Sequence, residues 1–220
     1  RLGALPGVQS ASLAAVAILA GDEWDSSMAV EGHQAKDGED MQAFMNAVSP
    51  GYFKTLKTPI LEGRDFTEAD AHKNNDENTI PMVAIVNRKF AEHFFPGRSA
   101  IGKHLGWGGG PKSKLSIEIV GVTADSLYEG PREGVRRQVF IPNWGKNNAV
   151  FYVRTNTPSN TVFPMLRGEV RSMDGSIPVY DLKTLEGQLD ETLLTDRLIA
   201  MLSAGFGVLA TLLATIGLYG

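Results

Sequence analysis

The chain has 220 residues, 43% of them hydrophobic, which is enough for a buried core, and a formal net charge of -4. This acidic balance argues against nucleic acid or anionic lipid as the main partner. Because the chain contains no cysteine, a disulfide framework, thiolate catalysis and thiolate metal sites are excluded within it.

The first part of the chain predicts short elements separated by turns. Glycines and acidic residues interrupt any periodicity over residues 22–40, which predicts a loop. Asn87 is placed to cap a helix that carries Phe90 and Phe94 and ends at Pro96-Gly97. The other expected elements are strands over 8–19, 41–48 and 82–86, a helix over 52–56 and a surface loop over 67–78.

The later part predicts further strands and two helices. Apolar residues alternate with polar ones over 115–123, which predicts a strand. Val162, Leu166 and Val170 recur at helical spacing. The expected elements are strands over 138–141, 149–154 and 177–182, a loop over 142–148 and a helix over 161–173. A β-α-β unit follows from this order, and the fold class is mixed α/β, or α+β, with the strand-rich block 49–148 as an inserted subdomain.

Residues 198–219 contain no charged side chain. At about 1.5 Å per residue a helix of this length spans about 33 Å, enough for a bilayer core of about 30 Å. The alternative is a buried core helix, but core helices usually keep a polar stripe. Only Ser203, Thr211 and Thr215 are polar here. The run therefore predicts a transmembrane helix that follows a folded domain.

Two side-chain patterns extend along this helix. Ser203, Gly207, Thr211 and Thr215 recur every four residues, and small residues let helix backbones approach closely in lipid. We expect this stripe to pack against other membrane helices. The second pattern consists of Leu185, Leu189 and Leu193, which keep helical spacing up to the apolar run. They predict one nearly continuous coupling helix over 184–219, about 50 Å long.

No stretch of the sequence carries a convincing catalytic or metal-binding pattern. The glycine-rich segment 106–113 resembles a phosphate-binding loop, but Pro111 stands where the second glycine belongs and a strand, not a helix, is expected downstream. Asp65 opens a segment that lacks the central glycine and the twelfth-position glutamate of a calcium loop. The sequence also contains no histidines at metal-ligand spacing and no G-x-S-x-G nucleophile elbow.

Ten short motifs, in order, carry a resemblance to a known family. They are LPGV at 5–8, VSPGYF at 48–53, EGRDF at 62–66, VAIVN at 83–87, FPG at 95–97, IGK at 101–103, EIVGV at 118–122 with Asp125, IP at 141–142, IPV at 177–179 and IGLYG at 216–220. In these motifs the chain resembles the MacB-like periplasmic core domain of bacterial ABC-transporter permeases, running into the start of an FtsX-like permease domain. The loops at 73–78 and 106–114 depart from the pattern, being more polar or richer in glycine.

The resemblance implies two lobes, one inserted in the other. The discontinuous β-α-β (porter-like) lobe would hold residues 1–48 and 149–196, the inserted strand-rich lobe 49–148, and the transmembrane segment 197–220. It also implies no catalysis, no cofactor and no metal in this domain. The domain would lie in the periplasm, anchored in the bacterial inner membrane. Its partners would be the membrane, a cytoplasmic ABC ATPase subunit, a periplasmic adaptor, and a second permease module in a dimer or pseudo-dimer.

Three classes of function are therefore compared. The first is a non-catalytic transport module that relays ATP-driven motion to export of a substrate or to a periplasmic partner. The second is the extracytoplasmic sensor domain of a membrane receptor, which also places a mixed α/β domain before a membrane helix. The third, a membrane-tethered hydrolase, is disfavoured because no nucleophile or metal constellation is evident in the sequence.

Overall fold

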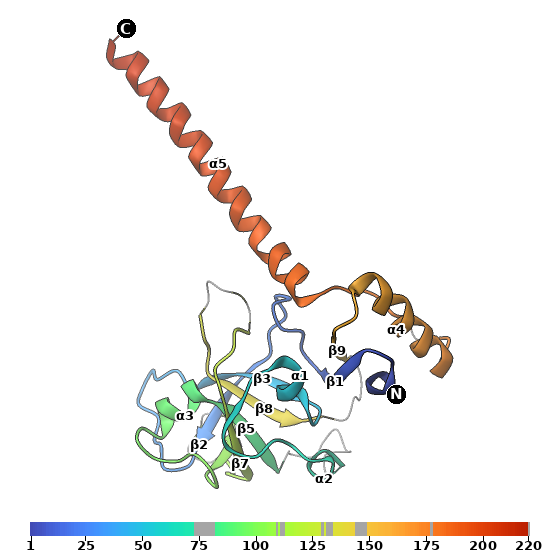
Figure 1. Ribbon diagram of the computed structural model, residues 1–220. Helices are drawn as coiled ribbons and strands as arrows, with labels where there is room; N and C mark the ends of the chain where they lie inside the picture. The colour runs from blue at the N-terminus through green and yellow to red at the C-terminus, as the bar shows by residue number, and fades with distance from the viewer. Residues whose placement is uncertain are drawn as a thin grey trace. The chain divides into compact units, whose positions relative to one another are not determined.

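The computed structural model describes residues 1–72, 82–108, 110, 113–128, 130, 134–143, 149–176 and 178–219, with only the backbone of residues 71, 72 and 195–197. The chain divides into two compact units, Arg1–Tyr180 and Asp181–Gly220. We call the first the sheet unit, because it holds the strands, and the second the helix unit, because it holds the long helix α5 (Leu185–Tyr219) (Figure 1).

The sheet unit is built from short elements. Its strands are β1 (Val8–Ala14), β2 (Asp25–Val30), β3 (Gln42–Val48), β4 (Ile60–Gly63), β5 (Val83–Asn87), β6 (His104–Trp107), β7 (Ile117–Thr123), β8 (Gln138–Pro142) and β9 (Val150–Thr155). Its helices are the 3-10 helix η1 (Leu2–Ala4), α1 (Tyr52–Leu56), α2 (Glu68–His72), α3 (Arg88–Phe94) and α4 (Ser159–Met173).

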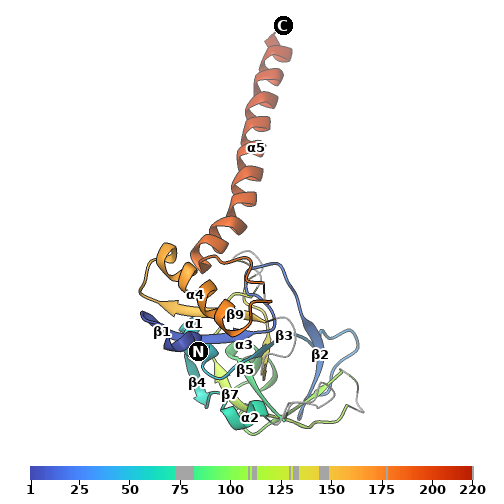
Figure 2. The same ribbon diagram turned by 90° about the vertical axis from the view of Figure 1, so that its right-hand side faces the viewer.

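Six strands of the sheet close into a ring. The order β2-β6-β7-β5-β8-β3 returns to its start because β2 pairs with both β6 and β3. Within the ring, β3–β8 and β5–β7 are the parallel pairs. Outside it, β1 meets β3 where Ala14 lies opposite Val48, β9 pairs with the other edge of β1, and β4 pairs with β7. Figure 2 shows β1 and β9 side by side with α4.

Two hydrophobic clusters lie on opposite faces of the ring strands. Successive residues of a strand point to opposite faces, and in β5 the side chains of Ala84 and Val86 join one cluster while Ile85 joins the other. The first cluster takes residues from all six ring strands and from α3. The second places Tyr52 and Phe53 of α1 against the opposite face, together with residues of β1 and β9. Helix α3 thus packs on the face that carries the first cluster, and helix α1 packs on the opposite face.

The structure confirms several local predictions. Helix α1 begins and ends where expected, between Gly51 and Lys57, both of which have left-handed backbone angles. Helix α3 follows Asn87, whose side chain accepts a hydrogen bond from the backbone N–H of Phe90 at 3.1 Å. This is the predicted N-cap. The mixed α/β class is also confirmed, since one sheet carries helices on both faces.

Other local predictions are wrong. Strand β2 lies inside the segment 22–40 that predicts a loop, because pairing with β3 and β6 organises residues that have no apolar periodicity. Helix α2 begins the segment predicted as a loop over 67–78, of which residues 73–78 lie outside the described part, as do residues 144–148 of the predicted loop 142–148. Residues 178–182 are not a strand. The β-α-β unit therefore has no second strand in the described residues.

The proposed lobes share one sheet. Strands β2 and β3, expected in the discontinuous lobe, lie in the ring with strands from block 49–148, whereas β1, β9 and α4 lie outside the ring. The division at residues 48 and 149 stays a prediction. The pairing pattern groups β2 and β3 with the inserted block.

Candidate functional site

The helix unit contains the chain's most distinctive surface. Helix α5 runs without a break over 35 residues, about 52 Å at 1.5 Å per residue. It is the one helix in the described part of the chain that is long and apolar enough to cross a membrane. Its large apolar side chains are exposed, among them Phe206, Leu213 and Leu218 at 68%, 68% and 79%. Exposed apolar surface of this extent is typical of a surface that interacts with a membrane or with another protein.

The small-residue stripe lies along the apolar part of α5. Ser203, Gly207, Thr211 and Thr215 are all exposed. The Thr211 hydroxyl donates to the Gly207 carbonyl at 2.8 Å, and the Thr215 hydroxyl donates to the Leu212 carbonyl at 2.7 Å. These threonines satisfy their own donors inside the helix, so they add no unpaired polar group to an apolar medium. Packing of the stripe against other helices stays a prediction.

The first turns of α5 carry the predicted coupling residues. Leu185, Leu189 and Leu193 lie in the same unbroken helix as the apolar run, as predicted from their spacing. At the helix start, the backbone N–H of Gly187 donates to the Thr184 side-chain oxygen at 3.0 Å. Such a bond satisfies an amide that has no partner within the helix. The coupling role of the three leucines stays a prediction.

The glycine-rich segment does not form a phosphate-binding loop in its described residues. Its first two residues belong to strand β6, and the Ser113 hydroxyl donates to the Gly108 carbonyl at 2.7 Å. The next element is strand β7, whereas a phosphate loop must open a helix. Residues 109, 111 and 112 lie outside the described residues.

The turn around Asp65, which the sequence does not predict to be a calcium loop, contains an arginine–aspartate pair. Arg64 donates to both carboxylate oxygens of Asp70, at 2.7 and 3.2 Å, and the Thr67 backbone N–H and hydroxyl donate to the same group. Burial alone would raise the pKa of Asp70, but these hydrogen bonds hold it at about 2. Desolvation raises the pKa of half-buried Asp65. In the described residues 64–72, the two carboxylates therefore accept hydrogen bonds that hold this turn, and residues 73–76 of the segment lie outside the described part of the chain.

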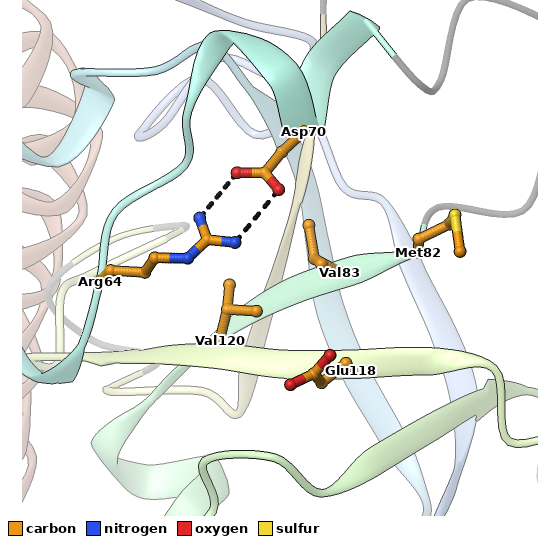
Figure 3. Close-up of a pocket in the computed structure, with 6 residues that line it drawn as sticks. All are labelled: Arg64, Asp70, Met82, Val83, Glu118 and Val120. Carbon is orange, nitrogen blue, oxygen red and sulfur yellow. Dashed lines mark hydrogen bonds and ion pairs between the residues drawn. The ribbon is translucent and has the colours of Figure 1, made fainter.

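A shallow pocket adjoins this pair. Its volume is about 320 Å³, and Figure 3 shows its lining: Arg64, Asp70, Met82, Val83, Glu118 and Val120. The Arg64 guanidinium points at Asp70, so the cation of the pocket is already paired. The six side chains include no cysteine, serine or histidine, and of the two carboxylates, Asp70 is held by Arg64. The pocket offers no recognisable catalytic arrangement.

Histidines that are scattered in sequence pair with carboxylates in the structure. His33 lies 2.9 Å from Glu39, and His104 lies 2.9 Å from Glu31. Hydrogen bonds from His104 and Lys103 lower the pKa of Glu31 to about 2. Among the described residues, no three or more histidine or acidic side chains are arranged to hold a metal ion. Sequence spacing could not reveal these pairs, because each joins separate elements or the two ends of a loop.

The motif residues that carry the family resemblance hold the fold together. Asn87 is buried, and its Oδ1 accepts from the backbone N–H groups of Phe90 and Gln138. Its Nδ2 donates to the Asp125 carboxylate at 2.9 Å and to the Arg136 carbonyl at 2.8 Å. One side chain therefore joins β5, α3, β8 and the segment after β7. Such a fully satisfied buried group fixes the arrangement of its neighbours.

Two motif glycines allow a close crossing of strands. Gly63 of β4 lies opposite Gly121 of β7. A Cβ on Gly63 would lie 2.2 Å from the Val120 carbonyl oxygen, and one on Gly121 would lie 2.4 Å from the Arg64 carbonyl oxygen. Gly63 also has a positive φ of 72°, which side chains rarely adopt. The packing of these strands therefore requires glycine at both motif positions.

Comparison with known proteins agrees with the family resemblance that these motifs carry. The family model described as "MacB-like periplasmic core domain" matches residues 5–173. The periplasmic region of MacB from Actinobacillus actinomycetemcomitans is similar, with a TM-score of 0.53, 14% identity and coverage of 79% of this chain and 71% of that one. No curated protein matches the chain.

A second solved structure is similar to the same extent. The extracellular domain of the noncanonic ABC-type transporter YknZ from Gram-positive bacteria gives a TM-score of 0.52 and 19% identity, and covers 83% of this chain and 85% of that one. The matched family region ends before α5, so the FtsX-like start expected there stays a prediction. The family model spans most of the sheet unit, and the chain belongs to the family of MacB-like periplasmic core domains.

Proposed function

We propose that the chain is a non-catalytic extracytoplasmic part of an ABC-transporter permease, which relays ATP-driven motion to export of a substrate or to a periplasmic partner. The observation that carries the proposal is the unbroken course of α5 from Leu185 into the apolar run. A continuous hydrogen-bonded helix transmits an axial movement or rotation along its length, whereas a flexible linker would absorb it.

The proposed setting follows from family membership and from the exposed apolar surface of α5. The sheet unit would lie in the periplasm and α5 would enter the bacterial inner membrane. A cytoplasmic ABC ATPase would supply the motion, and Ser203, Gly207, Thr211 and Thr215 would pack against other membrane helices. The proposal includes a dimer or pseudo-dimer of permease modules and a periplasmic adaptor as partners. It includes no cofactor and no nucleic acid.

The experiment compares Thr195→Pro with the matched control Thr195→Ala in the complete permease, reconstituted with its ATPase. Proline inside a helix removes a backbone hydrogen bond and clashes with the preceding turn, at a local cost of about 3 kcal/mol. Alanine at the same position keeps the helix. We expect Thr195→Pro to lower transport per ATP hydrolysed while the sheet unit stays folded, and Thr195→Ala to leave the ratio unchanged.

An unchanged ratio in correctly inserted Thr195→Pro would show that the junction is only a tether. The sensor alternative also places a folded domain before a membrane helix. A coiled signalling linker after residue 220 would indicate a sensor, whereas a basic loop and further apolar spans there would indicate a permease.

A further inference from the structure

In the described part of the chain, two strands of the sheet unit pair along one edge only. Strand β4 pairs with β7, and β9 pairs with β1. The other strands lie in the closed ring or, like β1, have a neighbour on both sides. An unpaired edge presents a row of backbone N–H and C=O groups that can pair with another chain. The edges of β4 and β9 are therefore the places where a further strand can extend the sheet.

The hydrogen bonds of β1 show which residues of β9 face its open edge. The Leu13 backbone N–H donates to Ser49 Oγ, and the Leu13 carbonyl accepts from the Ser49 backbone N–H, both at 3.0 Å. These groups of Leu13 therefore point away from Phe151, the residue opposite it in β9. Bonded and non-bonded pairs alternate along an antiparallel ladder. The backbone N–H and C=O groups of Phe151 and Val153 hence point outward from the sheet.

The two open edges differ in their protection. Strand β4 follows Pro59, contains Glu62 and has an irregular register with β7. Proline, charged side chains and bulges are features that prevent an edge from pairing with another chain. Strand β9 contains no proline or acidic residue, its one charged residue, Arg154, donates to the Thr55 carbonyl, and the Phe151 side chain is 59% exposed. The edge of β9 thus has the apolar character of a strand that pairs.

The open edge of β9 is complementary to itself. A twofold axis through Tyr152, perpendicular to the sheet, places Phe151 of one copy opposite Val153 of a second copy, with the two strands antiparallel. Both residues direct their backbone groups outward, so each symmetry-related pair exchanges both of its N–H···O bonds. The side chains form aromatic–β-branched pairs, which stabilise antiparallel strands. No like charges face one another, since Arg154 would lie opposite Val150.

We propose that two copies of the chain associate through β9 and extend the sheet across this twofold axis. The occupant of the open edge is then a second permease module of this sequence, and for the presence of that module the inference rests on the proposed function. Backbone hydrogen bonds supply affinity in such strand addition, and twofold contacts are the commonest in homo-oligomers. A sheet unit that stays monomeric would leave the proposed transport role of α5 untouched.

The first test is the oligomeric state of the full chain in detergent micelles, measured by sedimentation equilibrium. All proteins carry Gly207→Leu, whose bulky side chain disrupts the small-residue stripe, so that association through α5 does not contribute. Val153→Pro removes only an outward N–H and keeps the pairing with β1, but half of the hydrogen bonds between copies are lost. We expect the dissociation constant of the dimer to rise by about 30-fold.

Two further variants make this result specific. Val153→Thr keeps the N–H and the β-branched shape, so it is the matched control and should dimerise like its parent. Phe151→Lys changes an exposed side chain, which leaves the sheet unit folded, and places a charge beside the twofold axis, so it should also weaken the dimer. Circular dichroism verifies that each variant is folded. A monomeric parent, or a dimer that neither Val153→Pro nor Phe151→Lys weakens, would overturn the proposal.

The register is tested by disulfide formation, because the chain contains no cysteine of its own. Phe151→Cys and Val153→Cys proteins with different tags are mixed under mild oxidation. We expect mixed dimers beyond the statistical proportion, since directly opposite Cβ atoms lie about 5 Å apart and diagonal neighbours about 7 Å apart. Mixed and like dimers in statistical proportion would contradict pairing about Tyr152.

Discussion

The sheet unit and the helix unit place apolar side chains in opposite surroundings. In the sheet unit, Phe53, Phe90 and Ile85 are almost completely buried, whereas in α5 Phe206 is 68% exposed and Leu213 equally so. The sheet unit buries its large hydrophobic side chains in its own core, whereas α5 leaves such side chains exposed. The comparison teaches that the buried core lies in the first unit, whereas the second exposes an apolar surface that we propose packs against lipid and neighbouring helices.

The most severe test of this contrast is the same substitution in both units. Phe53→Ala removes a ring that packs 5.0 Å from Phe140, centre to centre, and should lower the free energy of unfolding of the sheet unit by about 4 kcal/mol. Phe206→Ala should change it by less than about 0.5 kcal/mol. Urea unfolding of both variants in detergent measures the difference. A similar loss in both would show that α5 is part of the core of the sheet unit.

The reverse comparison places a charge in each unit. Gly207→Asp puts a carboxylate near the middle of the apolar run and should disfavour membrane insertion by about 3 kcal/mol. Gly168→Asp, on the exposed surface of α4, should not affect insertion. A glycosylation-mapping assay reports both. Equal insertion of all three proteins would mean that α5 does not enter the hydrocarbon region.

Elements with a strong local signal are predictable from the sequence, and those defined by distant partners are not. The Asn87 cap, helix α1 between two turns and the uninterrupted apolar helix are local signals, and the structure confirms them. Strand β2 begins with three polar residues, and within it only Met28 and Val30 are buried. Its partners β3 and β6 close the ring from separate parts of the chain.

The candidate site follows the same division. The apolar run and its small-residue stripe are visible in the sequence because they depend on composition and spacing within one helix. The approach of His93 to Glu39 is not visible in the sequence, because the two residues come close only when the segment between β2 and β3 packs on α3. The strand expected over 177–182 has apolar residues at its start, but residues 178–182 pair with no other strand.

A smaller effect is expected at the polar centre of the sheet unit. Asn87→Ala leaves the backbone N–H groups of Phe90 and Gln138 and the Asp125 carboxylate without this partner. It should cost about 2 kcal/mol of unfolding free energy. Asn160→Ala, on the exposed first turn of α4, serves as the control and should cost almost nothing. Equal stability of the two variants would show that the hydrogen bonds of Asn87 do not hold the ring together.

The smallest effect concerns the surface pair near the pocket. Because the folded-state pKa of Asp70 is lowered to about 2, its contribution is present above the unfolded value of about 4 and is lost as the pH falls toward 2. The partner Arg64 is 47% exposed, so solvent screens the pair and we expect less than about 1 kcal/mol. Stability curves of Asp70→Asn and the unmodified chain should converge below pH 3. Parallel curves from pH 6 to pH 2 would contradict the assignment.

The central claim is that the sheet unit lies outside the cytoplasmic membrane while α5 enters it, and the absence of cysteine makes this directly measurable. A single cysteine is introduced by Arg167→Cys on exposed α4 or by Leu209→Cys in the apolar run, and intact cells are treated with a membrane-impermeant maleimide. The account predicts rapid labelling of the Arg167→Cys protein in intact cells, and labelling of the Leu209→Cys protein only after detergent is added. Labelling of the Arg167→Cys protein only after lysis would contradict it.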